Sequence, residues 1–304
     1  MLAPKDFVRD AAAMGRAWAL EESLGYTKWM ATGHYENFHV VSFLLPKHLH
    51  QDFYNVYAFC RWADDLGDEI GDTAESLRLL AWWRGELEAM YAGGETRHPV
   101  FTALRPTVEK HQLPVDPFAN LITAFEQDQV VTRYANWDEV MAYCVNSANP
   151  VGRLVLGLGG YRDAERYALS DATCTALQLA NFWQDVSVDL EKDRVYLPLD
   201  LLARHGVTVE DLFARRFTPG YAAAMREACG VARGLFEKGL ALPGMLDRRL
   251  ALDVTLFSRG GMYILDKIEQ RGYDTLTARP YISKGERVGL LLRALVSFAL
   301  RRAA

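Results

Sequence analysis

The sequence predicts an all-α fold, organised as one domain over residues 1–304. Two observations indicate this class: helix-forming residues dominate, and the alternation of apolar and polar residues that marks strands is nearly absent. The segments between the helical stretches are short and rich in glycine and proline, so none of them marks a domain boundary. Half of the residues are apolar and 24% are charged, which is enough to build a large core.

Long helices are expected wherever helix formers continue without interruption. They cover residues 51–69, 73–92, 115–134, 137–158, 164–190, 218–241 and 246–271. The expected loops between them are AGGETRHP (92–99), QLPVDP (112–117), GLGGYRD (157–163), DRVYLPLD (193–200) and LPG (242–244). The expected total is ten or more helices in one bundle.

Composition excludes several classes of protein. The net charge of -5 argues against a nucleic-acid partner, because such a protein needs a basic face to replace phosphate counterions. The four cysteines are far apart in the sequence, which favours reduced core thiols over a zinc cluster or a disulfide framework.

No membrane-spanning helix is predicted, because no run of 18 uncharged apolar residues occurs. The N-terminus carries charges where a signal peptide is apolar. The apolar tail 288–304 is expected to close the core, and the alternative is a helix lying on a membrane surface. We therefore expect a cytoplasmic protein, with peripheral contact at the inner membrane face left open.

A first acidic stripe occurs in YAFCRWADDLGD. On a helix, Tyr57, Arg61, Asp64 and Asp68 fall within an arc of about 60°. Two carboxylates one turn apart repel each other unless a cation lies between them, and such oxygen ligands suit Mg²⁺. The alternative is a solvated acidic patch with Arg61 as a partner within the helix.

A second stripe more than a hundred residues later repeats this arrangement. Gln178, Asn181, Asp185 and Asp189 cover an arc of about 80° on one helix face, with Phe182 and Trp183 among them. If the two helices face each other, acids converge from both walls of a cleft and can hold several Mg²⁺ ions and a diphosphate. Apolar walls would then shelter a carbocation from water. The alternative of another class is a non-catalytic helical protein that binds a partner or a membrane.

The motifs around the two stripes resemble the squalene and phytoene synthase family over nearly the whole chain. They are HYENFHVVSFLLP (34–46), YAFCRWADDLGD (57–68), AFEQDQVVTRY (124–134), YCVNSANPVGRLVL (143–156), the second stripe with DRVYLP (193–198), and YILDKIEQRGYDTL (263–276). The resemblance implies an all-α isoprenoid-synthase bundle with a central cavity. HYENF, SANPVGRLVL and NFWQDV look most like one branch, the hydroxysqualene synthases of bacterial hopanoid pathways.

The resemblance also implies roles for individual residues. The implied Mg²⁺ ligands are Asp64, Asp68, Asn181, Asp185 and Asp189. The four aspartates and Arg61 would be the catalytic residues. The implied substrate-binding residues are His34, Asn37, Phe38, Tyr57, Gln178 and Arg194.

Departures from the family pattern narrow the implied reaction. Many members have a tyrosine two or three residues after the tyrosine of YC, where this chain has Val145 and Asn146. That tyrosine is associated with forming the cyclopropyl intermediate, so its absence fits an enzyme that starts from presqualene diphosphate. The second motif has Gln184 where members commonly have arginine, which removes one cationic contact to diphosphate.

The implied activity is Mg²⁺-dependent conversion of presqualene diphosphate and water to hydroxysqualene and diphosphate, which would make the enzyme a carbon-oxygen lyase. The alternative within the family is a complete head-to-head coupling synthase that makes phytoene, dehydrosqualene or squalene. No nicotinamide cofactor is expected. The expected partners are an isoprenoid diphosphate substrate and the synthase that supplies presqualene diphosphate, with transient contact at a membrane surface.

Overall fold

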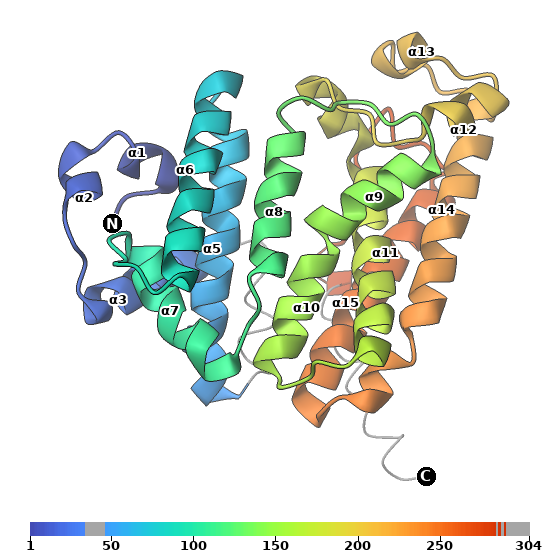
Figure 1. The fold of residues 1–304 in the computed structure, drawn as a ribbon. Helices are drawn as coiled ribbons and strands as arrows, with labels where there is room; N and C mark the ends of the chain where they lie inside the picture. The colour runs from blue at the N-terminus through green and yellow to red at the C-terminus, as the bar shows by residue number, and fades with distance from the viewer. Residues whose placement is uncertain (34–45, 284, 287–288, 290–304) are drawn as a thin grey trace. The chain divides into compact units, whose positions relative to one another are not determined.

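A computed structural model describes residues 1–33, 46–283, 285–286 and 289 (Figure 1). Within these residues helices dominate and no β-strand forms, the nearest approach being an isolated parallel bridge between Arg133 and Val195. The all-α prediction is therefore confirmed. Three residues predicted to bind substrate, His34, Asn37 and Phe38, lie outside the described residues.

The chain divides into two compact units. The first unit contains residues 1–130 and 150–163, and the second contains residues 131–149 and 164–304. Each unit has its own helices and its own buried core, so each is described by itself. The prediction of one domain over 1–304 stays a prediction.

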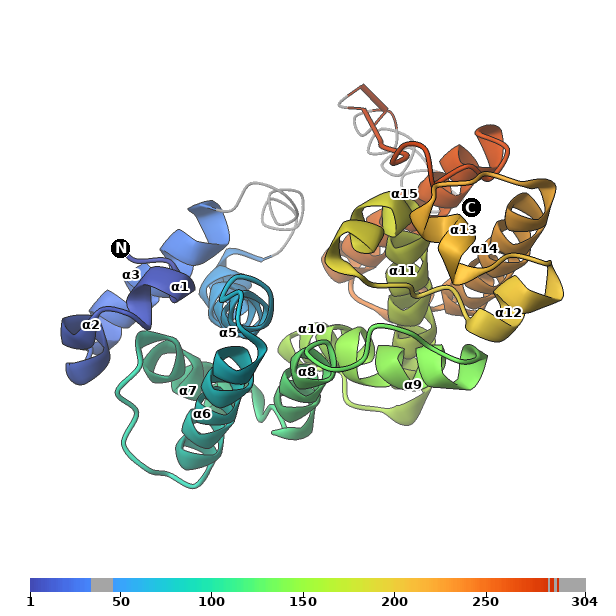
Figure 2. The same ribbon diagram turned by 90° about the horizontal axis from the view of Figure 1, so that it is seen from above.

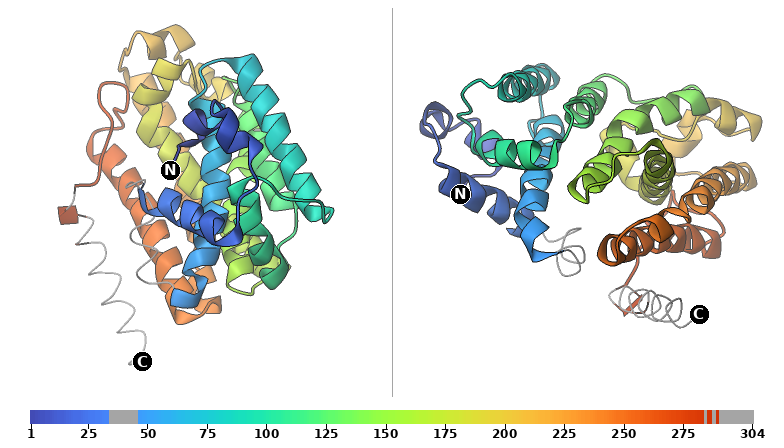
Figure 3. Two further views of the ribbon diagram at one scale, coloured as in Figure 1. Left: turned by 90° about the vertical axis from the view of Figure 1, so that its left-hand side faces the viewer. Right: turned by 60° about the horizontal axis from the view of Figure 1, so that its bottom comes forward.

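The first unit is formed by the N-terminal helices. Helix α3 packs against α5 and α7, while α6 and α8 pack against each other and against α5 (Figure 3). The elements are α1 (Pro4–Phe7), α2 (Ala11–Gly15), α3 (Leu20–Gly33), η1 (Lys47–Leu49), α5 (His50–Asp68), α6 (Thr73–Tyr91), α7 (Pro99–His111), α8 (Asp116–Gln127) and, from Pro150 on, α10 (Asn149–Leu158).

Aromatic side chains fill the core of the first unit and hold α5 in place. Trp62 of α5 stacks on Trp83 of α6, with ring centroids 5.0 Å apart and planes within 8°. The ring of His98 meets Trp62 edge-on at 4.3 Å. Burial lowers the pKa of His98 well below its ordinary value, so this histidine is a neutral core residue.

A buried polar network fixes α5 relative to α3 and α7. Asn55 of α5 accepts hydrogen bonds from Thr27 at 2.6 Å and from Gln51 at 2.9 Å. Its amide donates to the carbonyl of Ala103 at 2.9 Å and to Thr107 at 3.0 Å. Because every polar atom of Asn55 is used, sliding α5 along its neighbours would leave buried groups without partners.

The second unit is built around one long helix, α11. Helices α9, α14 and α15 pack around it (Figure 2). The elements are α9 (Trp137–Ser147), α11 (Ala164–Asp189), η2 (Leu190–Lys192), α12 (Leu199–Arg204), α13 (Val209–Phe213), α14 (Pro219–Gly239), η3 (Leu242–Met245) and α15 (Arg248–Gln270).

Two glycines allow the helices of the second unit to approach closely. A Cβ atom on Gly239 of α14 would lie 2.1 Å from the hydroxyl of Thr173 on α11. A Cβ atom on Gly261 of α15 would lie 2.4 Å from the ring of Phe236 on α14. These contacts set α11, α14 and α15 at the spacing that positions the site.

Two helix predictions are wrong in their boundaries. The helix expected over 115–134 ends at Gln127, because the following segment instead accepts a 2.9 Å hydrogen bond from Val195 N–H at Thr132. The helix expected over 137–158 is two helices, α9 and α10, separated at Ala148. Pro150 explains the break, because it lacks the N–H that a continuous helix would use and its ring crowds the preceding turn.

No helix among the described residues is long and apolar enough to cross a membrane. The apolar tail 288–304, for which a core-closing helix was predicted, falls outside the described residues apart from Gly289.

Candidate functional site

The first acidic stripe lies on α5 of the first unit. Tyr57, Arg61, Asp64 and Asp68 all fall within His50–Asp68, so the helical spacing that aligns them is confirmed. Asp68 is the last residue of the helix and is exposed, and the side chain of Asp64 is 41% exposed. Both carboxylates are therefore accessible to solvent.

Arg61 pairs with two acids of its own helix. Its guanidinium lies 3.2 Å from Asp64 and also contacts Asp65, whose side chain is only 6% exposed. Burial lowers the pKa of Arg61, but the charges of Asp65 and Asp64 outweigh it and raise that pKa above its ordinary value. Sequence reasoning missed Asp65, although the Asp64–Asp65 doublet was the available signal.

The C-terminal end of α5 is fixed by α8. The amide of Gln129 donates a 3.0 Å hydrogen bond to the carbonyl of Gly67. A Cβ atom on Gly67 would lie 3.5 Å from Phe125, so the helices meet closely beside Asp68. The backbone at Asp68 is therefore held in place, although the side chain of Asp68 is exposed.

The second acidic stripe lies on α11 of the second unit. Gln178, Asn181, Asp185 and Asp189 all fall within Ala164–Asp189, which confirms the predicted helix. Asn181 is exposed, and the other three side chains are half-buried. Burial, and then the charge of Asp185, raise the pKa of Asp189 to about 7. A cation held between these two carboxylates would reverse that shift.

Arg279, which sequence reasoning missed, already places a cation beside this pair. Its guanidinium donates two hydrogen bonds to Asp185, the one from Nη2 at 3.1 Å. The neighbouring Gln184 donates a 2.7 Å hydrogen bond to the carbonyl of Pro280. Gln184, the position at which family members commonly carry arginine, therefore anchors the segment that brings an arginine to Asp185.

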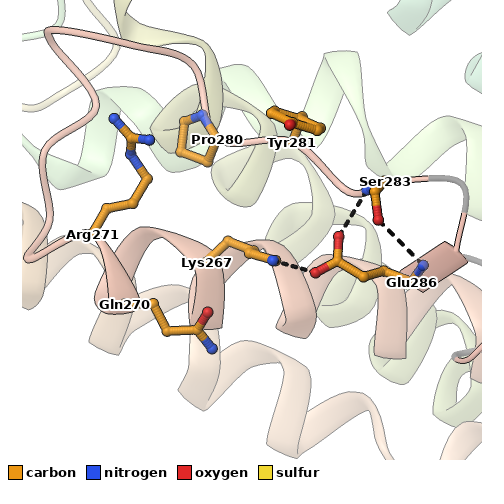
Figure 4. A pocket seen from close by; sticks show the side chains of 7 residues that line it. All are labelled: Lys267, Gln270, Arg271, Pro280, Tyr281, Ser283 and Glu286. Atoms are coloured by element: carbon orange, nitrogen blue, oxygen red, sulfur yellow. Dashed lines mark hydrogen bonds and ion pairs between the residues drawn. The ribbon is translucent and has the colours of Figure 1, made fainter.

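A polar pocket of about 400 Å³ ties this segment to α15. In Figure 4, Lys267 of α15 pairs with Glu286, which also accepts from the backbone N–H of Ser283 at 2.8 Å. Lys267, and then Ser283, lower the pKa of Glu286 to about 2. The ion pair between Lys267 and Glu286 links α15 to the segment that follows Arg279. Its lining residues are Lys267, Gln270, Arg271, Pro280, Tyr281, Ser283 and Glu286.

The segment predicted to be flap-like, residues 193–198, is firmly attached within the second unit. Val195 N–H donates to Thr132, and Leu199 N–H donates to Tyr134, both at 2.9 Å. Arg133 pairs with Asp193. The segment therefore acts as a strap, and it brings Arg194 to a small hollow that Asp189 also lines.

An aromatic wall borders Asp189. Tyr196 of the strap stacks on Phe182 of α11, with ring centroids 3.7 Å apart and planes within 4°. Tyr134 and Tyr143 lie 5.7 and 5.9 Å from Tyr196. Acid and aromatic surface thus meet in one place, as the sequence predicts, and an aromatic face attracts a cation.

Magnesium fits the donor atoms that the aspartates offer. Asp185 and Asp189 lie one turn apart on α11 and present carboxylate oxygens, the ligands that Mg²⁺ takes from proteins. The raised pKa of Asp189 indicates that this position favours an added positive charge. Within the described residues, however, no three His, Cys, Asp or Glu side chains gather to form a metal site.

A helical architecture, an aspartate stripe on each of two helices and an aromatic wall beside the second stripe define the class of an all-α isoprenoid synthase. Residues 31–286 match the family described as squalene/phytoene synthase. The chain belongs to the squalene/phytoene synthase family.

Relatives within the family differ in the activity for which they are named. The chain is 39% identical to a phytoene synthase of Thermus thermophilus, over 87% of this chain and 89% of the relative. It is 34% identical to a hydroxysqualene synthase of Sinorhizobium fredii, over 88% of this chain and 90% of the relative. Among solved structures, squalene synthase HpnC from Alicyclobacillus acidocaldarius is 43% identical with a TM-score of 0.80, covering 84% of this chain and 96% of that one.

Proposed function

We propose that the protein catalyses the Mg²⁺-dependent conversion of presqualene diphosphate and water to hydroxysqualene and diphosphate. The proposal is carried by what surrounds the aspartates of the α11 stripe. Asp189 borders an aromatic wall, and α9, whose Tyr143 belongs to that wall, carries Val145 and Asn146 at the two positions where many members of the family have a tyrosine. Similarity to hydroxysqualene synthases supports the same reaction.

The aspartates serve the departure of diphosphate. Asp64 and Asp68 of α5 and Asp185 and Asp189 of α11 would hold Mg²⁺, with Asn181 as a further oxygen ligand. Bound Mg²⁺ supplies charge stabilisation for the leaving diphosphate.

Three arginines add fixed positive charge, each from a different segment. Arg61 forms an ion pair with Asp64, and Arg279 forms one with Asp185. Arg194 and Asp189 line the same small hollow. Guanidinium groups suit diphosphate because their planar forks bind its oxygens in pairs. Tyr57, His34, Asn37 and Phe38 would complete the binding of the substrate.

The aromatic wall serves the carbocation that remains. The stacked rings of Phe182 and Tyr196 line the hollow beside Asp189, where they would attract positive charge and exclude bulk water. The substrate and the product are both long apolar chains. We therefore propose transient contact with the inner membrane surface, and delivery of the substrate by the synthase that makes it.

A second candidate is a complete head-to-head coupling synthase. The specific observation in its favour is the 39% identity to the phytoene synthase of Thermus thermophilus. Such an enzyme would also use both aspartate pairs, but it would start from two allylic diphosphates.

Product analysis on two substrates separates these candidates. Purified protein with Mg²⁺ is given presqualene diphosphate in one arm and farnesyl diphosphate alone in the other, and each arm is repeated with EDTA. We expect hydroxysqualene from the first arm, no coupled product from the second, and no turnover with EDTA. Presqualene diphosphate or a C30 hydrocarbon formed from farnesyl diphosphate would contradict the proposal. Equal, negligible turnover in every arm would favour a non-catalytic protein.

A further inference from the structure

Arg133, in the segment that precedes α9, holds the start of the strap at two points. Its guanidinium donates to the backbone carbonyl of Asp193 and, through Nη2, to the carboxylate of the same residue. It also donates to the carbonyl of Thr132 at 2.8 Å. A guanidinium is a planar fork with five N–H donors, so one arginine can fix both the backbone and the side chain of Asp193.

Asp193 is the residue at which the chain turns from η2 into the strap. Its φ of 57° lies in the left-handed region, which aspartate tolerates better than most residues other than glycine. A residue in this conformation depends on its surroundings to stay there. The two contacts from Arg133 are therefore placed where the strap needs them most.

The backbone on both sides of Arg194 is fixed by the same arrangement. The N–H of Arg194 donates a 2.9 Å hydrogen bond to the carbonyl of Asp189, and the next N–H, that of Val195, donates to Thr132 at 2.9 Å. The carbonyl that precedes Arg194 is the one that Arg133 holds. Arg194 thus extends from a held backbone beside the hollow that it lines with Asp189.

An aromatic ring of α13 lies against the Arg133 guanidinium. The central carbon of the guanidinium is 5.2 Å from the ring centroid of Phe213. The side chain of Arg133 is only 26% exposed, whereas that of Asp193 is 71% exposed. An aromatic face attracts a cation, so Phe213 keeps the guanidinium in the place from which it reaches the strap.

We propose that Arg133 is a positioning residue for the diphosphate of the substrate and that it acts through Arg194. This inference rests on the proposed function, because it takes the hollow beside Asp189 as part of the diphosphate site. With the strap held, Arg194 meets the diphosphate already ordered, and binding loses less conformational entropy. An exposed ion pair adds little to folding stability, so removing Arg133 should weaken diphosphate binding more than the fold.

A double-mutant cycle in diphosphate affinity tests whether Arg133 acts through Arg194. Arg133→Met, Arg194→Gln and the double variant are titrated in a calorimeter with inorganic diphosphate and Mg²⁺. Binding of presqualene alcohol, which has the apolar chains of the substrate but no diphosphate, is measured for each protein. Arg204→Gln is the matched control, because Arg204 forms an ion pair with Glu227 within the same unit. Melting temperatures report the fold, and Phe213→Ala replaces Arg133→Met in the cycle if the latter does not fold.

We expect Arg133→Met to weaken diphosphate binding about tenfold, as the loss of one charge-assisted hydrogen bond does. In the Arg194→Gln background, the same substitution should change the affinity less than about twofold, since the group that it positions is already gone. Binding of presqualene alcohol should not change, and the melting temperature should stay within about 2 °C of wild type. The Arg204→Gln control should bind both ligands as wild type does.

Wild-type affinity for diphosphate in Arg133→Met would overturn the inference, as would equal losses in the two backgrounds. A loss that extends to presqualene alcohol would also overturn it, because a general disturbance of the fold would then explain the result. A wild-type protein that binds no diphosphate in the presence of Mg²⁺ would instead overturn the proposed function, and the inference with it.

Discussion

Arg279 and Asp185 form a two-point ion pair across 94 residues of sequence, in which the guanidinium donates to both carboxylate oxygens. The pair joins the segment that follows α15 to the second aspartate stripe. Because Asp185 is also an expected Mg²⁺ ligand, the same carboxylate has two competing partners. The ion pair should therefore be strong in the metal-free protein and weak in the loaded one.

A double-mutant cycle with Asp185→Asn and Arg279→Gln measures this competition. In metal-free protein, the coupling in the free energy of unfolding should be about 0.5–1 kcal/mol, as for partly exposed ion pairs. With saturating Mg²⁺ and inorganic diphosphate, it should fall towards zero. Denaturant unfolding under the two conditions checks this, and an equal coupling in both would show that Asp185 does not exchange its partner.

Asp253 on α15 should make stability depend on pH. It is 3% exposed, and its carboxylate oxygens have no hydrogen-bond partner within the described part of the chain. Burial, and then the charge of Asp247, raise its pKa to about 8, whereas the unfolded value is about 3.9. The folded protein thus binds a proton that the unfolded chain releases. The stability from this group is complete below about pH 4 and is lost as the pH rises towards 8.

Asp253→Asn removes this titration and keeps the size of the side chain. Its melting temperature should fall less than that of wild type between about pH 5 and 8, and should exceed it by a few degrees at the upper end. Calorimetry of both proteins across this range is the measurement. Parallel curves would show that the carboxyl group does not carry a raised pKa.

The Asn55 network should carry much of the stability of the first unit. Asn55→Ala leaves the carbonyl of Ala103 and the hydroxyl of Thr107 without their donor in a buried environment. We expect a loss of about 2–4 kcal/mol in the free energy of unfolding. The control is Thr32→Ala on α3, an exposed residue whose hydroxyl bonds only the carbonyl of Lys28 in the described residues, which should cost far less. Similar losses for both variants would contradict the role given to the network.

Helical periodicity predicted α5 and α11 and the shared face of each stripe, because those relations are local and follow from 3.6 residues per turn. The end of α8 depends on a hydrogen bond between Thr132 and Val195, which local propensity does not encode. Arg279 was missed for the same reason, since nothing near it in sequence indicates a partner 94 residues away. The break at Ala148 was readable, because Pro150 follows it.

The central claim is that carboxylates on α5 and on α11 both serve the release of one diphosphate. Single-turnover release from presqualene diphosphate tests it most directly, in Asp64→Asn, in Asp185→Asn and in the control Glu75→Gln. Glu75, whose side chain is 44% exposed, is paired with Arg78 at the start of α6. Metal-supported charge stabilisation predicts a fall of about a hundredfold or more in both aspartate variants, with unchanged melting temperatures and a normal rate in the control. Release at the wild-type rate in either aspartate variant would contradict the claim.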